Sequence, residues 1–173
     1  MPFCASAVGI ATVVVLAVVG TYWFVASGAL PAGQDAGPLP LERWAARKSL
    51  RAAMRSEARN LKSPLPPAPG DLDAGAALYV SHCQVCHGGP DGSPSPIANG
   101  LAPQAPQLAK HGVEDDPEGV IYWKTAHGIR FTGMPAFHGA LSDRELWQIT
   151  SFLKRMSSAQ AQAAWAASAS KVK

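Results

Sequence analysis

The feature that most constrains this chain is a pair of cysteines three positions apart with a histidine directly after them, Cys83-Gln-Val-Cys86-His87. The 173-residue sequence has one further cysteine, near its N-terminus, so it cannot build a disulfide framework. A thioredoxin-like redox site would need a surrounding βαβ pattern, and a zinc site would need a second ligand pair at a suitable distance. The sequence offers neither pattern, so both kinds of site are disfavoured.

The spacing of the three residues instead suits covalent attachment of a haem group. Two thiols on one helical turn can bond the two vinyl groups at one edge of a porphyrin, and the next residue can point its imidazole at the iron. The sequence therefore predicts one haem c, attached at Cys83 and Cys86 and ligated through its iron by His87.

A haem iron in an electron carrier usually has a second protein ligand, often a methionine. Met134 stands in an irregular segment, Thr132-Gly-Met-Pro-Ala-Phe137, where glycine permits close backbone approach and proline stiffens the loop. We therefore predict Met134 as the sixth ligand, with His127 and His138 as rivals. The remaining methionines lie outside the predicted haem domain or on the apolar face of its last helix: Met1, Met54 and Met156.

The N-terminal residues 1–30 contain a long apolar stretch without charged side chains, from Ala5 to Ala26. As a helix it is long enough to cross the hydrocarbon core of a bilayer, which is about 30 Å thick. The rival interpretation is a cleaved signal peptide, although the expected basic start is missing. We predict a retained single-pass anchor in a bacterial inner membrane with the haem domain in the periplasm. The basic residues that follow the span conflict with the positive-inside rule, and covalent haem attachment outside the membrane outweighs that rule here.

Residues 31–70 form a proline-bracketed connector that carries most of the positive charge. It has seven basic and three acidic side chains, a net charge of +4, whereas residues 71–173 have eight and nine, a net charge of −1. Helix formers fill residues 41–61, and arginines recur there at a spacing of four, from Arg43 to Arg59. Like charges at this spacing repel one another, so the connector helix would gain from an anionic surface. Lipid headgroups, an acidic partner subunit and a plain solvated spacer all remain open.

Residues 71–157 have the pattern of a small helical domain without alternating strands. One helix leads into the cysteines, a second is expected over residues 117–126, and Ser142-Asp-Arg-Glu145 has the form of a capping box that opens a third. The Ala-rich tail, residues 158–173, is expected to be frayed helix or disordered and is given no function.

The stretch from Asp71 to His87 resembles the N-terminal helix of class I cytochromes c, which carries a glycine and an aromatic residue at the positions of Gly75 and Tyr79. The segment 151–153, Ser-Phe-Leu, is similar to the Ala-Tyr-Leu segment of that family, and Gly-Met-Pro at 133–135 resembles its distal-ligand loop. The resemblance covers about half of the chain, residues 71–157.

This resemblance implies an all-α fold with about three main helices around one covalent haem. It also implies that the N- and C-terminal helices cross closely at Gly75, and that Gly75 and Tyr79 meet Phe152, with Trp147 as a further candidate for this contact. The anchor and the arginine helix are not part of the family pattern.

The function that follows is one-electron transfer by a membrane-tethered mono-haem cytochrome with redox proteins as partners. No basic nucleic-acid-binding face is evident, and we expect neither a small-molecule substrate nor enzyme activity. Two alternatives stay open. The chain is a dedicated subunit of a membrane dehydrogenase or oxidoreductase complex, or it is a haem sensor or peroxidase-like enzyme, which would need an open or labile sixth position.

Overall fold

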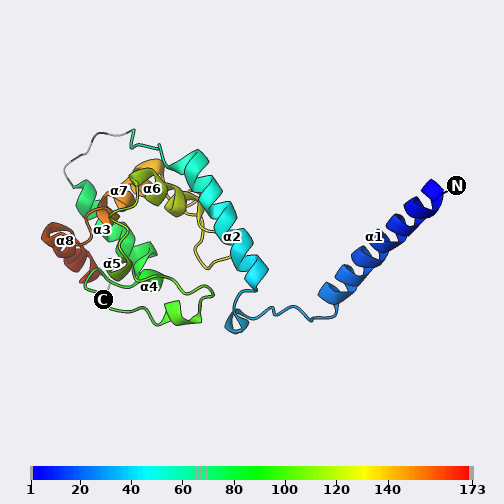
Figure 1. Cartoon of the computed structure of the whole chain (residues 1–173). Coiled ribbons are helices and arrows are strands. Elements are labelled where there is room, and N and C mark those ends of the chain that lie inside the picture. Colours follow the sequence, from blue (N-terminus) through cyan, green and yellow to red (C-terminus); the bar gives the residue numbers. More distant parts are fainter. Residues whose placement is uncertain (1, 65, 67, 69, 172–173) are drawn as a thin grey trace. The chain divides into compact units, whose positions relative to one another are not determined.

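The computed structural model describes residues 2–64, 66, 68 and 70–171. Over these ranges it contains helices and loops and no β-strand, so the predicted all-α fold is confirmed. The chain divides into two compact units, Met1–Ala36 and Gly37–Lys173. The helices, labelled as in Figure 1, have these bounds: α1 Pro2–Ala26, η1 Gln34–Ala36, α2 Pro40–Ala53, η2 Met54–Ala58, α3 Asp71–His82, α4 Gln84–His87, η3 Ile97–Gly100, α5 Leu108–His111, α6 Glu118–His127, α7 Asp143–Leu153 and α8 Ala159–Ala169.

The first unit consists mainly of α1. Residues 7–26 are long and apolar enough to cross a membrane, and none of this stretch is buried within the chain. A large apolar surface without protein cover is typical of a segment that lies in lipid. The same length and composition also suit a signal sequence, so α1 by itself fits either interpretation.

The core of the second unit lies where α3 crosses α7 (Figure 1). A side chain has no room at Gly75 on α3, because an added Cβ would meet the carbonyl group of Gln148 on α7. One turn later the rings of Tyr79 and Phe152 pack with their centroids 5.2 Å apart. The predicted close crossing and the predicted contact of Gly75 and Tyr79 with Phe152 are therefore confirmed.

Polar contacts hold the start of α3 against α7. The Asp71 carboxylate accepts hydrogen bonds from the side-chain amide of Gln148 at 2.9 Å, from the backbone N–H of Ala68 at 2.7 Å and from the Arg144 guanidinium at 2.9 Å. The Gln148 hydrogen bond, then the Ala68 hydrogen bond, and to a smaller extent Arg144 hold the pKa of Asp71 below its usual range. Charge-assisted hydrogen bonds of this kind favour the ionised carboxylate.

Helix α7 begins as its sequence predicts. The Ser142 side chain accepts the backbone N–H of Glu145, and the Glu145 carboxylate accepts the N–H of Ser142, which completes the capping box. Its apolar face then buries leucine, isoleucine and phenylalanine side chains in the core. Trp147, on the neighbouring face, stacks on Tyr122 of α6 with ring centroids 4.3 Å apart, so α6 and α7 also lie side by side.

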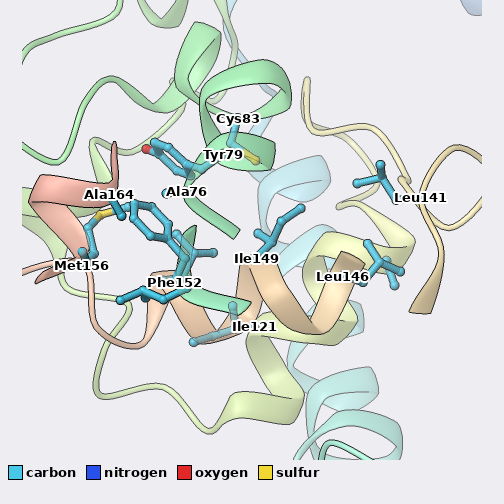
Figure 2. Packing of buried hydrophobic residues seen from close by; sticks show 14 residues of the cluster. Ala76, Tyr79, Cys83, Ile121, Leu141, Leu146, Ile149, Phe152, Met156 and Ala164 are labelled. Carbon is cyan, nitrogen blue, oxygen red and sulfur yellow. The ribbon is translucent and has the colours of Figure 1, made fainter. Parts of the chain in front are cut away.

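The tail differs from its expected state, because α8 is an ordered helix that packs on α3 (Figure 1). Ala161 and Ala164 are buried, and small side chains let the two helices approach closely. The indole N–H of Trp165 also donates to the side-chain oxygen of Gln84, at 2.6 Å. Figure 2 shows Ala164 of α8 close to Tyr79 and Phe152. The expectation of a frayed or disordered tail was wrong. The two faces of this helix differ little in hydrophobicity, so its sequence did not indicate that one face buries alanines.

The connector is also ordered. Helix α2 continues into η2, a π-helical segment, and η2 packs against α6. Ala58 is fully buried in this contact, and an added Cβ at Gly119 of α6 would meet backbone carbonyls of the connector. The indole N–H of Trp123 donates to the Glu57 carboxylate at 3.1 Å, and Lys62 pairs with Glu118 at 3.5 Å. The basic connector is thus attached to the second unit through α6.

Candidate functional site

Cys83, Cys86 and His87 lie on one short turn of helix at the end of α3. The N–H groups of Cys86 and His87 both donate to the Cys83 carbonyl, at 3.1 and 2.9 Å. Burial raises the pKa of the Cys83 thiol to about 12, with a smaller contribution from the charge of nearby Cys86. The backbone hydrogen bonds therefore hold the two thiols and the imidazole on one helical turn, as the motif requires.

The imidazole of His87 is held by a carbonyl group far along the chain. Its Nδ1 lies 2.8 Å from the carbonyl oxygen of Pro106. Because a carbonyl oxygen can only accept, this contact places the proton on Nδ1 and leaves Nε2 with a free lone pair for a metal. Hydrogen bonding of the second ring nitrogen fixes the orientation of histidine ligands in metal sites. The sequence analysis did not identify Pro106, because no local pattern marks a carbonyl that meets a side chain 19 residues away.

A mostly apolar cavity of about 660 Å³ opens beside this turn, within the size range of cofactor sites. Cys83, Cys86, His87 and Met134 all line it, so the structure brings the four predicted site residues to one cavity. Apolar side chains from α6, α7 and the loops supply most of the remaining wall. An apolar space with two thiols, an imidazole and a thioether on its walls fits a haem group well. The thiols would bond its two vinyl groups, and the imidazole and the thioether would ligate its iron.

The loop that carries Met134 is fixed by its own hydrogen bonds. The Met134 N–H donates to the Thr132 hydroxyl at 3.1 Å, and the Met134 carbonyl accepts the N–H of Ile129 at 3.2 Å. Phe131 has a φ of 61°, a left-handed conformation that is unusual for a bulky residue. A backbone conformation of this kind persists where surrounding contacts hold it in place, often at binding sites.

The two rival histidines do not line the cavity. The His138 Nδ1 lies 2.9 Å from the carbonyl oxygen of Ala126, and the His127 ring packs on Trp123 with centroids 4.8 Å apart. The two imidazoles also contact each other, with centroids 5.6 Å apart. Both side chains therefore have structural contacts away from the cavity.

Several charged side chains line the same cavity, among them Arg130 in the loop after α6. Lys124 of α6 pairs with Asp116 at 2.8 Å. Arg43 and Arg47 come from α2, in the connector. The arginine spacing was visible in the sequence, but nothing local indicated that this helix would form a wall of the site.

Comparison with known proteins gives the same assignment for this part of the chain. Residues 70–153 match a family model described as cytochrome c oxidase, cbb3-type, subunit III. The chain is also similar to cytochrome c6 of Limnospira maxima, with 29% identity over 86 residues, which is 49% of this chain and 91% of the relative. The matched segment contains the cysteine–histidine turn, the Met134 loop and the crossing of α3 and α7. Residues 70–153 therefore form a domain of the class I c-type cytochrome family, which binds one covalently attached haem c.

Proposed function

We propose that this chain is a membrane-tethered one-electron carrier in which Cys83 and Cys86 hold the haem and His87 and Met134 ligate its iron. The observation that carries the proposal is the presence of all four side chains on the walls of one cavity. The haem supplies the chemistry, a reversible change of iron between Fe(III) and Fe(II). A soft thioether ligand favours Fe(II) and raises the reduction potential.

The protein contributes a mostly apolar cavity with fixed ligands. Pro106 holds the imidazole of His87, and the loop hydrogen bonds to Thr132 and Ile129 hold Met134 in place. Ligands fixed in this way move little when the charge of the iron changes, which keeps the cost of reorganisation low. Val85, between the two cysteines, is 53% exposed, so the attachment turn is accessible to a partner protein.

The ligand assignment is tested by replacing Met134 with alanine in the haem-loaded protein. We expect wild type to keep a six-coordinate, low-spin spectrum and to bind carbon monoxide slowly when reduced. Met134→Ala should bind carbon monoxide rapidly, because its sixth position is open. The matched control is Met156→Leu, since Met156 is 2% exposed in the core and does not line the cavity. An unchanged low-spin spectrum in Met134→Ala would assign the sixth ligand to another side chain.

The tether and the compartment belong to the same proposal. We infer that residues 1–30 anchor the chain in a bacterial inner membrane, residues 31–70 form the connector, residues 71–157 form the haem domain in the periplasm, and residues 158–173 form a tail. The apolar surface of α1 and the extracytoplasmic site of covalent haem attachment support this arrangement. Protease added to spheroplasts should remove the haem-stained domain, whereas a cytoplasmic haem domain would survive that treatment.

A second candidate function is a dedicated subunit of a membrane oxidoreductase complex. The matching family model takes its description from a subunit of a cbb3-type cytochrome oxidase, which favours this candidate. A native gel of mildly solubilised membranes, stained for covalent haem, separates the two. A haem band near the size of the single chain plus detergent supports a tethered shuttle. A haem band in a large assembly that survives moderate salt supports a subunit, and the comigrating proteins identify the reaction.

A further inference from the structure

One face of the connector helix α2 forms a wall of the haem cavity. The α2 residues that line it recur with helical spacing, so they share that face: Glu42, Arg43, Ala46, Arg47 and Leu50. Pro38, just before α2, also lines the cavity. The thiol-bearing turn belongs to α3 and α4, so α2 contributes a different part of the wall from the attachment site. Figure 1 shows α2 and α4 as separate elements of the second unit.

Packing of the following segment, η2, holds α2 in this position. The helix continues without a break into η2, and η2 is fastened to α6 by buried Ala58 and by the hydrogen bond between Trp123 and Glu57. Gly119 permits backbone contact that any larger residue would prevent. Arg43 and Arg47 are therefore presented to the cavity by a docked helix, and not by a free spacer.

The charges on the cavity wall leave these two arginines without an acidic partner. Lys124 is paired with Asp116, and the Glu42 carboxylate accepts the N–H of Leu39 at 3.3 Å. Among the residues that the structure describes, no carboxylate lies within ion-pair distance of Arg43 or Arg47. Two like charges one turn apart also repel each other, so an anion between them would stabilise the helix.

We propose that Arg43 and Arg47 bind the propionate carboxylates of the haem. A haem carries its two propionates on the side of the macrocycle remote from the two vinyl-bearing rings, so they point away from the thioether bonds. A guanidinium matches a carboxylate with two parallel hydrogen bonds, which adds geometric specificity to the attraction between the charges. The connector helix thereby becomes part of the haem-binding site. This inference rests on the haem attachment proposed above.

The test uses the full-length haem-loaded protein in detergent, with two measurements on each variant. Resonance Raman spectroscopy reports hydrogen bonding of the propionates through their bending mode. Redox titration gives the ratio of reduced to oxidised haem at a fixed ambient potential. The variants are R43Q/R47Q, the conservative R43K/R47K, and the matched control R51Q/R55Q. The control arginines, on α2 and on η2, are exposed and do not line the cavity.

In R43Q/R47Q we expect the propionate bending mode to shift to lower frequency. The ratio of reduced to oxidised haem should also fall by roughly three- to tenfold, because two positive charges near the iron are lost. R43K/R47K should restore most of the redox ratio, since it keeps the charge. The control R51Q/R55Q should leave the bending mode unchanged.

An unchanged propionate mode in R43Q/R47Q, at wild-type haem content, would overturn the inference and leave the proposed electron-transfer function intact. An equal shift of that mode in R51Q/R55Q would also overturn it, because the effect would then follow the charge of the helix and not the cavity contact. Wild-type protein without covalent haem would instead refute the proposed function itself. Since both arginine side chains are exposed, the glutamine variants should fold, and the single variants R43Q and R47Q provide a second measurement of each contact.

Discussion

The crossing of α3 and α7 depends on the absence of a side chain at residue 75, and Gly75→Ala tests this directly. The methyl group would overlap backbone atoms of Gln148, and it would lie only 3.0 Å from the Cβ of Phe152. Because backbone atoms cannot rotate away, the two helices would have to separate. That separation would loosen the contact between the rings of Tyr79 and Phe152, which are now 5.2 Å apart.

The expected magnitude combines two opposing contributions. Overpacking of a well-packed interface costs about 1–3 kcal/mol, and the upper end applies here because backbone is the obstacle. Alanine gains about 1 kcal/mol over glycine inside a helix. The net loss should therefore be about 2 kcal/mol, a large share of the roughly 5–15 kcal/mol that stabilises an ordinary domain.

Urea unfolding of the haem-loaded protein, followed by circular dichroism, measures this loss. With a slope of about 2 kcal/mol per molar urea, the midpoint should fall by about 1 M. The control is Gly139→Ala, where an added Cβ meets no atom within 4 Å and the backbone conformation is ordinary. It should change the free energy of unfolding by less than about 0.5 kcal/mol. A Gly75→Ala protein as stable as wild type would refute the argument that close backbone approach requires this glycine.

Three further variants test single contacts. Tyr79→Phe removes the hydrogen bond that the buried hydroxyl donates to the Gly88 carbonyl at 2.7 Å, so urea unfolding should show a loss of about 1–2 kcal/mol with haem attachment unchanged. Asp71 has a lowered pKa in the folded state, so its contribution is present above the unfolded-state pKa near 4 and is lost as pH falls through the lower folded-state value. Asp71→Asn should therefore flatten the pH dependence of stability below about pH 4, and an unchanged profile would contradict that role. Trp165→Phe removes the 2.6 Å hydrogen bond to Gln84 and should speed hydrogen exchange in α8, whereas equal exchange would show that the contact contributes little.

Sequence patterns predicted those parts of the fold that depend on neighbouring residues. The capping box at Ser142 and Glu145 is local, so it placed the start of α7 at the correct residue. The attachment turn is also local, since its thiols and imidazole lie within five consecutive positions, 83–87. The contact of Gly75 with α7 is long-range, and only the family resemblance made it predictable.

The parts that were missed depend on contacts between distant segments. The tail has many alanines and little contrast between faces, so nothing in its sequence indicates that Ala161 and Ala164 are buried against α3. The docking of η2 on α6 relies on Gly119 and on a hydrogen bond between residues 66 positions apart, Glu57 and Trp123. Such contacts follow from the tertiary fold. The pattern of residues within one helix does not indicate which distant segment that helix packs against.

The docking of the connector has a consequence for how far the haem domain can travel. Because η2 packs against α6 and α2 continues into η2, the chain that links α2 to α1 runs only from residue 27 to residue 39. Thirteen residues reach at most about 45 Å when fully extended, and the helix η1 within them shortens that reach. If α1 spans the bilayer, as we propose, the linker keeps the haem domain within a thin layer next to the membrane. Partners embedded in that membrane then meet it at an effective concentration in the millimolar range, whatever its abundance in the cell.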